Sequence, residues 1–181
     1  YQGKITPVNL RHSSVAGLPS YSSLSKIPGQ ADLVVAVIPH DHYDTLFKAC
    51  RKKGLRHIIL IQDWENLPPE SCKNARSIIQ KYHGDELNIS VCNSAGIQLP
   101  SLNLNIGTQA DYPAGHIALL TGHSTVSRNI NHLLNTMHQG VSRHISLNYN
   151  LSPTTSADWL SRFGHNRHTK VAVIHYNPAE N

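Results

Sequence analysis

Polar and turn-forming residues recur at several places in this chain, each directly after a segment expected to be a β-strand. Four such stretches come early, at 6–11, 39–42, 62–66 and 92–96. If the strands are parallel, these stretches gather along one edge of a sheet. An extended anionic ligand lying over that edge would meet backbone N–H groups and helix N-termini. The pattern therefore favours binding of a phosphate-bearing molecule.

Two histidine groupings suggest metal chemistry, and in both a structural interpretation is favoured. The run His40-Asp41-His42 has no third ligand at a recognisable spacing, so we expect a solvated strand-to-helix turn and no metal. His165 and His168 lie three residues apart in a polar segment, which is typical of a surface turn.

Histidine and serine side chains around an expected helix start could support covalent chemistry. His123 is the histidine best placed for phosphoryl transfer, because the positive end of a helix dipole would stabilise a phosphohistidine. Ser124 and Ser127 have no general base that the sequence identifies, which disfavours a hydrolase triad.

The residues that must position these stretches begin with segment 31–62. Residues 33–38 form an apolar, Val-rich run that predicts a strand buried on both faces of a parallel sheet, and Pro39 ends it. A helix to Lys53, capped by Asp41 or Asp44 and ended by Gly54, leads to a second strand at 57–61. This order predicts a βαβ unit with a right-handed crossover.

The remaining elements predict two α/β halves. The first half, 1–112, adds a strand at 4–8, a helical turn within 22–27, a helix at 69–82 and a strand at 88–91 that ends in a turn at 92–96. We expect 97–115 to be a linker or cover loop, with a domain boundary near Tyr112. The second half, 113–181, is expected to contain strands at 116–120, 141–147 and 171–174 and helices at 126–137 and 156–163.

Composition limits the partners and the compartment. The formal charge of +5 suits an anionic ligand, but no Lys/Arg block is dense enough to indicate nucleic acid. No apolar run approaches a membrane span and no signal peptide is visible. The three cysteines, Cys50, Cys72 and Cys92, are widely spaced and predict free thiols in a reducing compartment, hence a cytoplasmic protein.

An ordered series of motifs identifies a family resemblance. PVNLR is followed by GLPSYSSLSKIPGQADLVVAVIP, KGLRHIILI, CNSAGI and GHIALLTGHSTVS. This series resembles the coenzyme A-binding half of NDP-forming acyl-CoA synthetases. It is most similar to the bacterial protein lysine acetyltransferases of the Pat type, which carry a degenerate synthetase region. The resemblance covers essentially the whole chain, and GLPSYSSLSKIPGQADL is its most specific part.

The resemblance implies a fold and a set of ligand-contacting residues. The fold would be a Rossmann-like, parallel-sheet CoA-binding domain lacking its first strand, followed by part of a second, flavodoxin-like and succinyl-CoA-ligase-like α/β domain. CoA or acetyl-CoA would lie along the strand ends. The residues matched by position are Asn9, Arg11, Ile38, Pro39, Gln62, Asp63, Asn93, Ser94, Gly96, Thr121 and Ser124. Cys92, Leu10 and His123 depart from the family pattern at these positions.

The resemblance also implies parts that these residues do not contain. The chain starts at Tyr1 without Met, so we expect the first strand and its glycine-rich phosphate turn upstream, and the reactive phosphohistidine downstream of Asn181. Without that strand the neighbouring sheet edges would be left unpaired, unless they pair in a rearranged or intermolecular way.

Three functional hypotheses follow. The first is a CoA- or acyl-CoA-binding region of a larger protein acetyltransferase or synthetase, inert as an isolated fragment. Its partners would be ATP-grasp and acetyltransferase domains of the parent protein, or further copies of itself. The second is part of a working acyl-CoA synthetase that acts through a phosphohistidine outside this chain. The third is a degenerate scaffold that binds no nucleotide.

Overall fold

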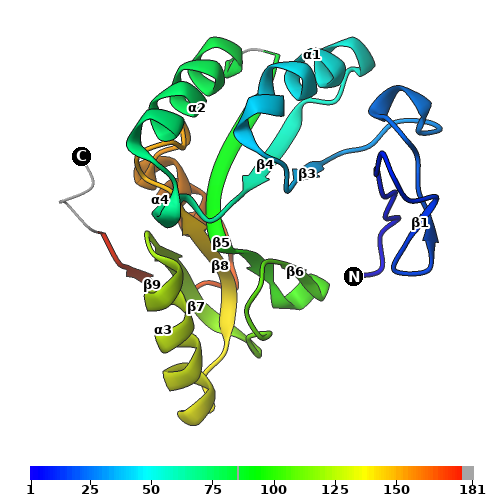
Figure 1. Cartoon of the computed structure of the whole chain (residues 1–181). Coiled ribbons are helices and arrows are strands. Elements are labelled where there is room, and N and C mark those ends of the chain that lie inside the picture. Colours follow the sequence, from blue (N-terminus) through cyan, green and yellow to red (C-terminus); the bar gives the residue numbers. More distant parts are fainter. Residues whose placement is uncertain (85, 177–181) are drawn as a thin grey trace.

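A seven-stranded sheet forms the centre of the protein. The computed structural model describes residues 1–84 and 86–176 (Figure 1). The strand order is β3-β4-β5-β8-β7-β9, and β6 pairs with β5 beside this path. These strands are β3 (Val34–Ala36), β4 (His57–Ile61), β5 (Asn88–Leu99), β6 (Leu104–Ile106), β7 (Ala114–Thr121), β8 (Val141–Leu147) and β9 (Val171–Ile174).

The first part of the sheet is a parallel α/β arrangement, as predicted. Strands β3, β4 and β5 are parallel, and α1 (Tyr43–Lys53) and α2 (Pro69–Tyr82) connect them. Gly54 ends α1 in the left-handed conformation that its lack of a Cβ allows. Pro69 opens α2, where its missing N–H costs nothing. The predicted aspartate cap of α1 was wrong, because His42 holds that position and no side chain caps it.

The helices cover both faces of the sheet (Figure 1). Helices α1 and α2 bury Phe47 and Ile79 against Leu60, on one face of β4. Helix α4 (Ser156–Gly164) buries Phe163 against Ile61, on the opposite face. Helix α3 (Ser124–Thr136) packs beside β7, on the face opposite to α4. The sheet is therefore enclosed between two layers, which is the α/β class expected from the sequence.

The predicted strand at 33–38 is shorter and more exposed than expected. Strand β3 has one neighbour, β4, and its outer edge is open. Leu33, Val35 and Val37 are 38%, 42% and 72% exposed, so only one face of β3 is packed. The apolar composition predicted burial on both faces, which was wrong because no helix covers this end of the second face.

The N-terminal residues form a separate small unit. Its elements are a two-stranded hairpin, β1 (Ser14–Val15) and β2 (Leu18–Pro19), and the single 3₁₀ turn η1 (Leu24–Lys26) that the sequence predicts. The predicted strand at 4–8 was wrong: only Val8 forms a bridge, with Tyr21. The Lys53 ammonium donates to the Ile27 carbonyl over 2.7 Å and ties this unit to α1.

Residues 92–96 do not form the predicted turn, because β5 runs straight through them. Asn88 to Cys92 pair with β4, and residues from Cys92 to Leu99 pair with β8 and β6. The register shifts between Cys92 and Ile97, which marks a bulge. The predicted loop at 97–115 contains η4 (Pro100–Leu102) and β6. Both halves of the chain therefore share one sheet, and the predicted division at Tyr112 stays a prediction.

The second half follows its sequence pattern closely. Strands β8 and β9 have the predicted bounds, and α3 begins two residues before the predicted Val126. Thr155 and Asp158 form a reciprocal capping box at the start of α4, one of the two threonine caps predicted. Two further 3₁₀ turns, η2 (His40–His42) and η3 (Trp64–Asn66), follow β3 and β4.

Candidate functional site

Three strands end at the middle of β5. Because β5 is parallel to β4 and antiparallel to β8, the carboxyl ends of both neighbours reach Cys92: Ile61 and Leu147 are each its pairing partner. Thr121, the last residue of β7, pairs with Ser146 beside them. We call this region the β5 junction, defined by Gln62, Asn93, Ser94, Thr121 and Ser124. Five residues predicted from three separate stretches thus come together.

The buried Asn93 side chain links β5 to its neighbours through hydrogen bonds. Its side chain is 1% exposed. The Asn93 amide nitrogen donates to the carbonyls of Gly122, over 2.9 Å, and Leu147, over 3.3 Å. Its amide oxygen accepts from the Asn148 amide over 3.2 Å. These bonds use most of the capacity of the Asn93 amide, so its role at the site is to position the turn before α3.

The N-terminus of α3 faces β5 across a pair of hydroxyls. Ser94 donates to the Ser124 hydroxyl over 2.9 Å. His123 is the N-cap residue, and its Nδ1 accepts from the backbone N–H of Thr125 over 3.2 Å. The unpaired N–H groups of a helix start carry a partial positive charge, so this end of α3 attracts anions. That is the ligand class predicted for Thr121 to Ser124.

The Thr121 side chain points away from that helix start. It is fully buried, and its hydroxyl lies 2.5 Å from the Ser127 hydroxyl and 3.1 Å from Nε2 of His144. On the other side of the ring, the Gln109 amide lies 3.1 Å from Nδ1 of His144. Burial lowers the pKa of His144 to about 3, so the ring is neutral. The Thr121 hydroxyl therefore connects α3 to β8 inside the core.

Gln62 and Asp63 form the other side of the β5 junction. The Gln62 N–H donates to the Cys92 carbonyl over 3.4 Å, and its side-chain oxygen accepts from the Tyr43 hydroxyl over 3.3 Å. Asp63 is exposed, and its carboxylate accepts from the Asn66 amide over 2.7 Å. Burial raises the pKa of Tyr43, so this phenol stays a donor. The Gln62 amide is thereby held at the end of β4.

Ile38 and Pro39 follow the end of β3, near the Tyr43 end of α1. Ile38 packs on the α1–α2 core, and the Pro39 carbonyl accepts from the His42 N–H over 3.1 Å. Gly96 lies farther along β5 and has a different role. Its φ is +63°, and a Cβ there would collide with the Ile106 carbonyl of β6. Gly96 is thus required for the packing of two strands.

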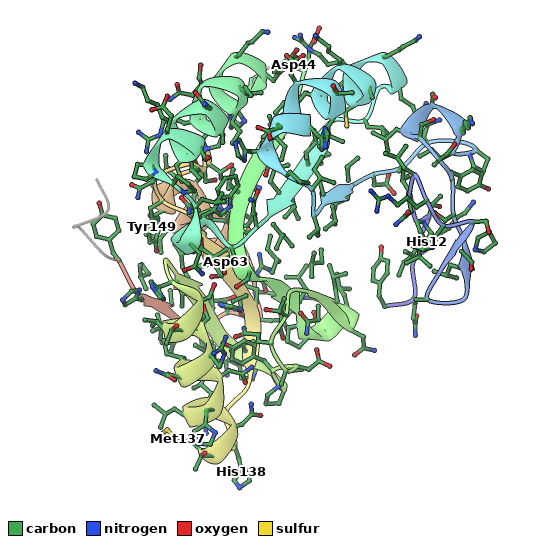
Figure 2. The ribbon with its side chains drawn as sticks, viewed as in Figure 1. His12, Asp44, Asp63, Met137, His138 and Tyr149 are labelled. Carbon is green, nitrogen blue, oxygen red and sulfur yellow. The ribbon has the colours of Figure 1, made fainter. Side chains whose placement is uncertain are left out.

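Asn9 and Arg11 lie apart from the β5 junction. The Asn9 side chain accepts from the backbone N–H groups of Arg11, over 2.9 Å, and His12, over 3.1 Å. Figure 2 shows His12 in the N-terminal unit, well away from Asp63. The structure thus places these two residues outside the group that forms the β5 junction.

Sequence reasoning missed three residues that organise this region. Tyr43 and Asn148 hold Gln62 and Asn93, while His144 lies beneath α3. All three partners are distant in sequence, so no local motif reveals them.

Neither a metal centre nor a membrane span is found in the residues that the structure describes. No group of three His, Cys, Asp or Glu side chains within 1–84 and 86–176 is arranged to hold a metal ion. Within the same residues, no helix has the length and apolar character needed to cross a membrane.

Comparison with known proteins identifies the family of the chain. Residues 1–98 match the family described as the CoA binding domain. The alpha subunit of acetate–CoA ligase [ADP-forming] II from Pyrococcus furiosus is 24% identical over 177 residues, covering 97% of this chain and 38% of that subunit. Acetate–CoA ligase [ADP-forming] from Methanocaldococcus jannaschii is 24% identical over 178 residues, covering 97% and 25%. The chain therefore spans well under half the length of these relatives.

Solved structures share the fold. A protein from Pyrococcus horikoshii OT3 superimposes with a TM-score of 0.82 at 22% identity, covering 97% of this chain and 40% of that one. The dinucleotide forming acetyl-coenzyme A synthetase 1 of Ca. Korarchaeum cryptofilum, in complex with phosphate and ADP, gives 0.81 at 20% identity, covering 98% and 39%.

The fold defines a Rossmann-like protein of the α/β class. The chain belongs to the CoA binding domain family, which its first 98 residues match.

Proposed function

We propose that this chain recognises CoA or acyl-CoA within a larger acyl-CoA synthetase of the NDP-forming type. The observation that carries the proposal is the β5 junction, where the ends of β4, β7 and β8 meet the N-terminus of α3. The family match over residues 1–98 supports the choice of ligand. Similarity to ADP-forming acetate–CoA ligases supports the class of parent protein.

The residues at the β5 junction fit the chemistry of CoA. Gln62 offers an amide, Ser94 and Ser124 offer hydroxyls, and the first turn of α3 supplies a positive partial charge. Phosphate groups suit such a donor set. Asp63 is the one acid among the predicted ligand residues, and it is occupied with Asn66. Bound CoA would supply a thiol that carries the acyl group as a thioester.

Most of the predicted residues have a proposed part in binding. Gln62, Ser94 and Ser124 would contact the ligand, while Asn93 and Thr121 would hold α3 in place. Further predicted contacts, by family position, are Ile38 and Pro39 on the path of the ligand and Asn9 and Arg11 on its phosphates and ribose.

Calorimetric titration with CoA, acetyl-CoA and NAD tests this proposal. Thr125→Asp is the informative variant: residue 125 is exposed in the first turn of α3, where an acid stabilises the helix but repels phosphate. We expect CoA affinity to fall about tenfold while stability is kept or raised. Thr136→Asp, at the opposite end of α3, is the matched control and should bind as wild type. Absence of heat with every ligand would favour the non-binding scaffold.

The parent protein decides between the two catalytic hypotheses. A synthetase forms acyl-CoA with nucleotide hydrolysis through a phosphohistidine, whereas an acetyltransferase transfers the acyl group to lysine. Assaying the full-length protein for both activities separates them, and the named relatives favour the synthetase. A cytoplasmic location, ATP-grasp and acetyltransferase partner domains, and homo-oligomer formation stay predictions.

A further inference from the structure

A shallow, open pocket lies at the far end of α4, outside the β5 junction. Its volume is about 500 Å³, and its lining residues are basic or amide-bearing: Arg143, Arg162, His165, Asn166, Arg167 and His168. We call it the α4 basic pocket. No acidic side chain among residues 1–84 and 86–176 lines it, whereas the chain as a whole carries eleven acids.

Arg143 is the residue that makes this cavity more than a set of surface cations. It comes from β8, and its Nε is buried without a hydrogen-bond partner among the described residues. Its guanidinium lies over the Phe163 ring, 5.9 Å from the centroid. Burial lowers the pKa of Arg143. A half-buried cation with no acid beside it is costly, and an anion in the cavity would offset that cost.

The other cations reach the cavity from a turn held in place by local hydrogen bonds. Arg162 lies over the Trp159 ring, 5.2 Å from the centroid. His165 Nδ1 lies 2.7 Å from the Ser161 carbonyl, and the His168 N–H donates to the Asn166 side chain over 2.8 Å. The helix dipole explains basic residues at the end of α4, but it does not explain a buried arginine on β8.

The described ion pairs do not use the arginines of the α4 basic pocket, so their guanidinium groups can bind an anion. The described carboxylates in ion pairs, Asp41, Asp44 and Glu86, lie with partners on or near α1 and α2. Asp158 acts on Arg162 through space, one helical turn away, and it is also bound to Thr155 in the capping box. No described carboxylate forms an ion pair with Arg143 or Arg167.

We propose that the α4 basic pocket binds a small ligand carrying a di- or polyphosphate group, at a site separate from that for CoA. Guanidinium groups suit this ligand because each offers paired N–H donors to phosphate oxygens. Arg143 would bind from the floor of the pocket and Arg162 and Arg167 from its rim. The histidine pair His165 and His168, expected from sequence to be a surface turn, lies on the same rim.

The test is calorimetric titration of the chain with sodium pyrophosphate and with orthophosphate, in the presence of saturating CoA. We expect pyrophosphate to bind and orthophosphate to bind at least about tenfold more weakly, since fewer oxygens are shared among the arginines. Arg162→Gln, an exposed change, and Arg143→Lys, which keeps the charge but removes the paired donors, should each weaken binding about tenfold. Arg76→Gln, on the exposed face of α2, is the charge-matched control and should bind as wild type.

Distinct results would overturn the proposal. Equal weakening by Arg76→Gln would indicate attraction to net charge alone. Loss of pyrophosphate binding when CoA is added would show that the two ligands compete for one site, which contradicts a separate site for pyrophosphate. Thr125→Asp separates the two proposals further, because it should reduce CoA binding and leave pyrophosphate binding unchanged. Thermal unfolding of each variant confirms that its fold is intact.

Discussion

The side-chain amide of Asn93 donates to the backbone carbonyl of Gly122 across 2.9 Å, joining the middle of β5 to the turn that starts α3. One amide thus connects the parallel strands of the first half with the anion-attracting helix of the second.

Asn93→Ala should destabilise the protein by about 1–3 kcal/mol, because two buried carbonyls lose their donor. Asn93→Asp should cost more, about 3–5 kcal/mol, because it buries a carboxylate against those oxygens. Urea unfolding monitored by circular dichroism measures both. Asn129→Asp, at an exposed position on α3, is the control and should have little effect on stability. If Asn93→Asp and Asn129→Asp have equal free energies of unfolding, the hydrogen bonds of the Asn93 amide do not stabilise the fold.

Two glycines with similar positive φ angles allow the cost of backbone strain to be distinguished from the cost of a steric collision. Gly54 has φ +71° and open space around it, so Gly54→Ala should cost about 1–2 kcal/mol. Gly96 has φ +63° and lies against the Ile106 carbonyl, so Gly96→Ala should cost about 3–5 kcal/mol. Unfolding midpoints in urea give the comparison. Similar losses of stability in the two variants would mean that β6 moves away from the new Cβ at residue 96 without an energetic cost.

The buried His144 predicts a loss of stability in mild acid. Its pKa falls from the ordinary 6.5 to about 3 in the folded protein, so below pH 6.5 only the unfolded chain takes up this proton. Stability should therefore decrease as pH falls through this window, by up to about 1.4 kcal/mol per pH unit. Stability of His144→Gln should depend less on pH between about pH 6.5 and 5.

The exposed His132→Gln serves as the control for that comparison and should keep the wild-type slope. A wild-type slope in His144→Gln as well would mean that other groups cause the acid sensitivity.

The three thiols should react in a fixed order. Burial raises the pKa of Cys50 to about 11 and that of Cys92 to about 12, so neither forms thiolate at neutral pH. Cys72 on α2 is partly exposed. Titration with Ellman's reagent should release about one equivalent from the folded protein and about three in urea. Cys72→Ser should abolish the fast reaction; fast release from that variant would contradict the burial of Cys50 and Cys92.

Elements set by local chemistry could be predicted from sequence. Pro69 and Gly54 mark helix ends by their own backbone preferences, and the apolar run of β4 is stable only when it is buried. These features need no knowledge of distant residues. The α/β class follows from their alternation.

Features set by distant partners could not be predicted. The segment Asn93-Ser94-Ala95-Gly96 has the composition of a turn, yet β8 and β6 pair with β5 around it. Thr121 was predicted to open the turn after a strand, whereas it is the last residue of β7 and its buried hydroxyl lies 3.1 Å from His144. The α4 basic pocket likewise depends on Arg143, which comes from another strand.

Because β5 belongs to both ladders, a break in the connection between β6 and β7 should not release two independent pieces. One piece would keep β5 and the other β8, each without its pairing partner. The two pieces should therefore reassemble when co-expressed, as the halves of a split reporter do. The protein could in this way be made to report whether two fused partners meet.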